Sequence, residues 1–194
     1  RRTTPAPNPE TGSGVARSRV RGFPVAVVDD STVFDTVFDL PVHILVVHAV
    51  VVLGPLAALS ALVYAAWPAA RRYLGWPLLA VAALATASAY VATESGDELE
   101  DRLSADPTVS MEEFARIEVH TDLGDAAYTA LLVLLGVVAV CVLWALAPRR
   151  KVPAPVRVVA AVALAGVALW AGYAVVRAGH SGSEAVWLIR NAVG

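Results

Sequence analysis

Cysteine and charge are both scarce in this chain. Cys141 is the single cysteine among 194 residues, and charged residues make up 16% of the total. One cysteine excludes an internal disulfide framework and any metal motif built from several thiolates. The charged fraction lies well below the ~25% that is usual in soluble domains. With a net charge of -2 and no basic cluster beside stacking aromatics, the sequence gives no reason to expect nucleic acid as a partner.

The motifs of common hydrolases and nucleotide-binding proteins are missing as well. No G-x-x-x-x-G-K-[ST], H-E-x-x-H or G-x-S-x-G pattern occurs. The acidic part of the chain also lacks the D-x-[DN]-x-[DN]-G pattern of a calcium-binding loop. The sequence therefore favours a protein that is not an enzyme on its own.

Long uncharged runs, by contrast, dominate the chain. Hydrophobic residues make up 57% of it, and its mean hydropathy is +0.63. Because about 20 apolar residues span a bilayer as a helix, we expect four spans, at about 41–67, 77–94, 126–147 and 156–177. We therefore predict an all-α, four-helix transmembrane bundle over residues 41–178. It would be a multi-pass protein of the cell membrane, in contact with the lipid bilayer.

The flanking segments have different patterns. Residues 1–30 are rich in Pro, Gly, Ser and Arg without apolar periodicity, which predicts a disordered N-terminal tail. Within residues 31–40 the tetrapeptide TVFD occurs twice, and in a helix its Val and Phe residues would share one face. This predicts a short interfacial amphipathic helix before the first span, with an irregular linker as the alternative. Residues 179–194 are expected to form a C-terminal tail.

Charge in the connecting segments predicts the orientation. Glu94–Asp125 contains eleven acidic residues and two arginines, whereas the two short turns contain six basic residues: Arg71, Arg72, Arg149, Arg150, Lys151 and Arg157. By the positive-inside rule, the turns face the cytoplasm, and the acidic segment and both termini are extracytoplasmic. Ser110 and Glu113 form a capping-box pattern, which predicts a helix beginning near Met111 and leading toward the third span.

The four histidines then fall at the outer end of the bundle. His43 and His48 open the first span, His120 precedes the third, and His180 follows the fourth. Ionisable groups in a span are candidates for function, and imidazole is a common ligand for metals and for haem iron. The sequence points first to His48 together with His120 or His180, with His43 as a further member. Glu94 could add a carboxylate to a metal site.

Several functions are compatible with this cluster. The histidines could hold one haem b or one divalent metal ion in an electron-transfer-like role, or they could be polar residues that bind nothing. The acidic segment suggests instead a structural or accessory subunit without a cofactor. Such a subunit would dock another membrane subunit or a second copy of the chain through that segment.

Two local patterns carry a resemblance to a known family. The stretch from Leu40 to His48 reads LP-x-H-x-x-x-V-H, and the dipeptide Val-His, present there as residues 42–43, recurs at 119–120 before the third span. Together with the glycine-rich segment 179–182, this resembles the uncharacterised bacterial membrane family known as domain of unknown function 2231, over about residues 40–187. The resemblance implies four spans and a membrane location, and it supplies no activity. Residues 184–187 depart from the Gly–Leu–Val–Tyr-like stretch expected at that position.

Overall fold

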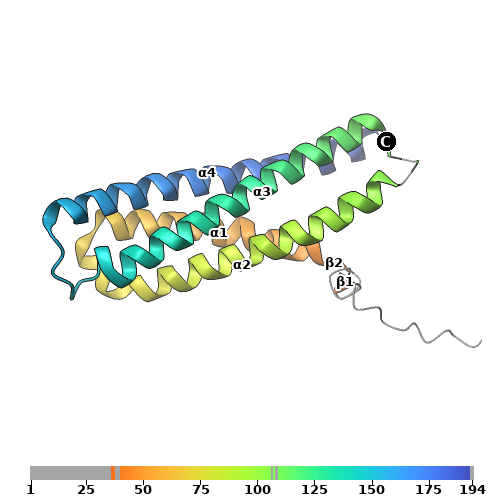
Figure 1. The fold of residues 1–194 in the computed structure, drawn as a ribbon. Coiled ribbons are helices and arrows are strands. Elements are labelled where there is room, and N and C mark those ends of the chain that lie inside the picture. Colours follow the sequence, from red (N-terminus) through yellow and green to blue (C-terminus); the bar gives the residue numbers. More distant parts are fainter. Residues whose placement is uncertain (1–35, 38–39, 106, 108, 193–194) are drawn as a thin grey trace, which may run out of the picture.

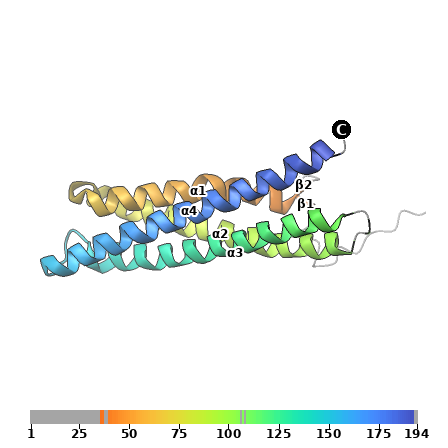
Figure 2. The same cartoon turned by 90° about the horizontal axis from the view of Figure 1, so that it is seen from above.

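The computed structural model describes residues 36–37, 40–105, 107 and 109–192. Four long helices lie side by side as a bundle (Figure 1): α1 (Val42–Ala66), α2 (Arg71–Ser104), α3 (Met111–Val140) and α4 (Ala154–Ala192). Helices α1 and α3 each pack against both α2 and α4, and they face one another across the diagonal of the bundle. Seen from above in Figure 2, α1 lies beside α4 and α2 lies beside α3. All four helices are long and apolar enough to cross a membrane, which confirms the predicted four-helix fold.

The segment before α1 differs from the prediction. Strands β1 (Thr36–Val37) and β2 (Leu40–Pro41) form a two-residue antiparallel ladder. The predicted interfacial helix over 31–40 is therefore wrong for the residues of it that the structure describes. Proline disfavours helical backbone at the residue before it, so Leu40 is kept extended and α1 begins only after Pro41. Residues 1–35 and 38–39, including the predicted tail, lie outside the described residues.

The acidic segment between the second and third spans is largely helical. Helix α2 continues to Ser104, and α3 begins at Met111 with the predicted capping box. Ser110 Oγ accepts a hydrogen bond from the Glu113 N–H at 3.2 Å, and the Glu113 carboxylate accepts one from the Ser110 N–H at 2.9 Å. The prediction of a helix that starts near Met111 is confirmed, and docking through this segment stays a prediction. Helix α4 likewise extends to Ala192, through most of the segment expected to be a tail.

Small side chains fill the interior of the bundle. Alanines with 0% exposure occur in every helix, at Ala57, Ala61, Ala85, Ala130, Ala168 and Ala171. Lipid tails are as apolar as leucine, so membrane helices associate through close packing, which small residues permit. Some larger side chains are fully buried as well, among them Leu78, Leu134 and Leu164. Many other large apolar side chains point outward, which is consistent with a lipid-facing surface: Val52, Leu59, Leu84, Val162 and Leu169.

The two halves of the bundle repeat one another. His43 in α1 and His120 in α3 are 77 residues apart, and the same interval relates three buried pairs in these helices: Ala57 and Leu134, Ala61 and Val138, Tyr64 and Cys141. An interval of 86 residues relates four buried pairs in α2 and α4: Leu78 and Leu164, Ala82 and Ala168, Ala85 and Ala171, Ala89 and Val175. The hairpins α1–α2 and α3–α4 therefore use equivalent positions for their contacts. The short Val-His repeat belongs to this larger pattern.

Candidate functional site

Two of the four histidines meet inside the bundle. His43 lies in the first turn of α1 and His120 lies in α3, and both side chains are half-buried. Their ring centroids are 6.3 Å apart, and the ring planes are nearly perpendicular, at 85°. We call the end of the bundle that contains this pair the histidine end. Since α1 and α3 are diagonal neighbours with few other contacts, the two rings bridge the interior of the bundle there.

The ring of His43 is oriented by a hydrogen bond that it donates to a neighbouring helix. Its Nδ1 lies 3.0 Å from the Ala92 carbonyl oxygen and 3.4 Å from Ser95 Oγ, both in α2. A carbonyl oxygen can only accept, so Nδ1 carries the proton and donates it. In a neutral imidazole the other nitrogen, Nε2, is then unprotonated and has a lone pair for a ligand.

The ring of His120 is held in the equivalent way by α4. Its Nδ1 lies 3.0 Å from Ser181 Oγ, and the Ser181 hydroxyl donates to the Ala178 carbonyl oxygen at 2.9 Å. Because the serine proton is committed to that carbonyl, Ser181 Oγ accepts the hydrogen bond from His120 Nδ1. Nε2 of His120 is therefore also the unprotonated nitrogen of its neutral ring. Ser95 and Ser181 are related by the 86-residue interval of α2 and α4.

A glycine packs against each ring. A Cβ atom added to Gly96 would lie 3.2 Å from His43 Cε1, and one added to Gly182 would lie 2.8 Å from His120 Cε1. A larger residue at 182 would overlap the His120 ring, and one at 96 would require the His43 ring to shift slightly, because both imidazoles lie close to the backbone of α2 and α4. Segment 179–182 was recognised as glycine-rich, but neither Ser-Gly dipeptide was predicted to contact a histidine. Their spacing of 86 residues is the signal that could have identified them.

The other candidate residues lie elsewhere. The side chain of His48, which the sequence favoured as the central residue, is exposed on α1. His180 is exposed on α4, with Nε2 3.4 Å from Glu184 Oε1, and Glu94 is exposed on α2. The pair that forms is His43 with His120. Among the described residues, no group of three or more His, Cys, Asp or Glu side chains is arranged to hold a metal ion.

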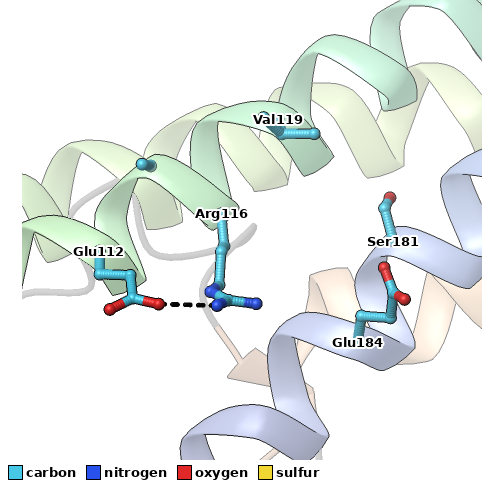
Figure 3. A pocket seen from close by; sticks show the side chains of 6 residues that line it. Glu112, Arg116, Val119, Ser181 and Glu184 are labelled. Carbon is cyan, nitrogen blue, oxygen red and sulfur yellow. Dashed lines mark hydrogen bonds and ion pairs between the residues drawn. The ribbon is translucent and has the colours of Figure 1, made fainter.

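A cavity of about 320 Å³ lies beside the pair, between α3 and α4 (Figure 3). Arg116, held 2.8 Å from Glu112, points into it from α3, and Ser181 and Glu184 face it from α4. Ser181 is also the hydrogen-bond partner of His120. The cavity therefore connects the surface of the histidine end with the residues that orient one of the two rings.

Comparisons with known proteins identify the family. Searches of the curated proteins and of the solved structures found no match to this chain. One family model, described as "Predicted membrane protein (DUF2231)", matches residues 39–193. That range contains all four helices and both histidines of the pair. The chain is an integral membrane protein that belongs to the DUF2231 family of predicted membrane proteins.

Proposed function

We propose that the protein binds one haem between His43 and His120 and acts as an electron carrier in the membrane. The observation that carries this proposal is the anchoring of both rings. Each imidazole has Nδ1 committed to a hydrogen bond with a neighbouring helix, which leaves Nε2 as the nitrogen available to a ligand. Histidines that bind metals typically donate their other ring N–H to a fixed acceptor, which sets the tautomer and the ring orientation.

The number of ligands favours haem over a simple metal ion. Structural zinc sites use four protein ligands and catalytic ones use three, whereas two imidazoles converge at this position. A haem iron needs only axial ligands from the protein, because the porphyrin supplies the other four nitrogens. Iron bound there would supply one-electron transfer. The chain's own contribution would be to hold both imidazoles in fixed orientations at the histidine end of the bundle.

The spacing of the rings is compatible with both imidazoles holding one metal centre. With metal–nitrogen bonds of about 2.0 Å, two imidazoles on the same metal ion could have centroids roughly 6 Å apart. The centroids of His43 and His120 are 6.3 Å apart. Glycines rather than larger residues stand beside both rings, at Gly96 and Gly182. These glycines let both rings pack against the backbone of α2 and α4, which fixes the position of each ring on that side.

The absorption spectrum of the purified full-length protein, expressed with haem supplied, tests the proposal. We expect a Soret band with a stoichiometry of one haem per chain. His43→Ala and His120→Ala should each lose most of it, and His48→Ala and His180→Ala should keep it, because those two side chains are exposed. Added imidazole should restore the low-spin spectrum of the first two variants if they remain folded.

Two results would contradict the haem proposal. One is a wild-type protein that stays colourless although circular dichroism shows it to be helical. The other is a Soret band that survives in both His43→Ala and His120→Ala, which would place any haem elsewhere in the chain.

A further inference from the structure

A band of exposed aromatic side chains marks one surface of the membrane. It lies at the end of the bundle opposite the histidines, where α1 joins α2 and α3 joins α4, and we call this the turn end. Each member of the band is more than half exposed: Trp67, Tyr73, Trp76 and Trp144. Tryptophan and tyrosine collect at the level of the lipid headgroups. The turn end therefore lies at one interface of the bilayer.

The first exposed carboxylates beyond this band mark the other surface. Along α2 the first is Glu94, 18 residues from Trp76. Along α3 it is Asp125, 19 residues from Trp144. At 1.5 Å per residue both distances are roughly 27–29 Å, which is close to the ~30 Å thickness of the hydrocarbon core. Two helices thus place the second interface at the same level.

The histidine pair lies just beyond that level. His43 is 23 residues from Ala66, the last residue of α1, and His120 is 24 residues from Trp144. Both histidines are therefore roughly 35 Å from the turn end along the helices. A tilt of about 20°, the average for membrane helices, shortens this to roughly 33 Å along the bilayer normal. The pair is thus at headgroup level, outside the hydrocarbon core.

The cavity beside the pair opens on this aqueous side. Its lining includes Glu112, Arg116 and Glu184, whose side chains are 80%, 42% and 60% exposed. Ser181 belongs to the same lining and accepts the hydrogen bond from His120 at 3.0 Å, so the cavity reaches a residue in direct contact with the ring. Figure 3 shows these side chains around the opening. Two carboxylates against one guanidinium give the lining a net negative charge, which favours a cation over an anion.

We propose that the redox partner of this site is a small, water-soluble, positively charged molecule that enters the cavity between α3 and α4. This inference rests on the proposed haem and names the class of molecule with which it exchanges electrons. One electron passes between that molecule and the iron, and no bond of the protein forms or breaks. A quinone dissolved in the hydrocarbon core is not the expected partner, because the pair and the cavity both lie outside the core.

Cysteine labelling of the full-length protein in lipid nanodiscs tests the aqueous position and does not require haem. Cys141→Ser removes the native thiol, and either Val119→Cys or Val133→Cys then adds one. Both valines are exposed on α3, at 55% and 40%, and of the two Val119 lines the cavity. A charged methanethiosulfonate reagent should modify Val119→Cys at least on the order of tenfold faster than Val133→Cys, because charged groups are strongly disfavoured at hydrocarbon depth. Equal rates would refute the aqueous position of the cavity.

Stopped-flow reduction of the haem-loaded protein tests the partner. The reductants are hexaammineruthenium(II), a water-soluble cation, and a lipid-soluble quinol. Glu184→Gln removes one carboxylate of the cavity and should slow reduction by the ruthenium complex about two- to fivefold, the effect of one exposed charge interaction. Reduction by the quinol should not change. Glu98→Gln is the matched control, because Glu98 is an exposed carboxylate of α2 that lies outside the cavity lining.

The outcomes separate this inference from the haem proposal. An unchanged rate in Glu184→Gln, or an equal loss of rate in Glu98→Gln, would refute entry through the cavity while the Soret band still supports haem. A colourless protein would refute the haem and with it the electron exchange. The labelling of Val119→Cys would then still show whether water reaches the cavity.

Discussion

Replacing Gly182 by alanine would disturb the packing of His120 directly. The added Cβ would lie 2.8 Å from His120 Cε1 and 3.2 Å from Nε2, well inside the ~3.5–4.0 Å of favourable carbon contacts. The ring is not free to swing aside, because its Nδ1 is hydrogen-bonded to Ser181 Oγ at 3.0 Å. Either this hydrogen bond breaks or α4 moves away from α3. Gly166 in the same helix provides a matched control, since a Cβ there would meet nothing within 4 Å.

The expected loss of stability follows from three contributions. Overpacking a well-packed interior costs about 1–3 kcal/mol, and losing a hydrogen bond costs about 0.5–1.5 kcal/mol. Exchanging glycine for alanine within a helix gains about 1 kcal/mol. This gain is common to Gly182→Ala and Gly166→Ala, so it cancels when the two variants are compared. The first variant should therefore be less stable than the second by the sum of the two costs, about 1.5–4.5 kcal/mol.

Cys141 offers a convenient measure of unfolding. It is the only cysteine and is buried at 2% exposure, so a thiol-reactive fluorogenic dye should label it only when the bundle opens. On heating in detergent, Gly182→Ala should be labelled at a lower temperature than wild type, and Gly166→Ala at the same or a higher one. If Gly182→Ala proves as stable as Gly166→Ala, the close approach of His120 to α4 is wrong.

Two further substitutions test contacts away from the histidines. The Thr86 hydroxyl shares its one proton between the Ala82 carbonyl oxygen in α2, at 2.8 Å, and the Leu131 carbonyl oxygen in α3, at 3.2 Å. Thr86→Val should remove the contact with α3, and hydrogen bonds between membrane helices contribute about 0.6 kcal/mol on average. The labelling temperature of Cys141 should fall by less than in Gly182→Ala, and a larger fall would contradict this estimate. Ser110→Ala should remove the cap of α3 and accelerate amide hydrogen exchange several-fold in its first turn while leaving Cys141 labelling unchanged. Unaltered exchange there would argue against the capping box.

Much of the fold could be predicted from hydropathy alone, and the reason is physical. Within a bilayer every backbone polar group must be satisfied internally, so a long uncharged run has few options besides a helix. The four spans follow from that constraint, whereas the continuation of α2 and α3 through most of the acidic segment 94–125 does not. The capping box of Ser110 and Glu113 was also readable, because it depends only on residues three positions apart. The extended backbone at Leu40 could not be predicted in the same way. The TVFD repeat favoured a helix over residues 31–40, although a proline such as Pro41 keeps the residue before it extended.

The pairing of the histidines was decided only by the tertiary structure. His43 and His48 are five residues apart, about 140° around a helix, so both cannot face the same centre. Helix α1 is apolar on every side, and its sequence therefore does not reveal which side packs against the other helices. That choice depends on where α2 and α4 bring Ser95, Gly96, Ser181 and Gly182. The sequence by itself determined that four helices are long and apolar enough to cross a membrane, and it predicted that histidines gather at one end. Only the packing of the two equivalent hairpins made His43 and His120 the pair, because it places Gly96 and Gly182 where these two rings can approach the neighbouring helices.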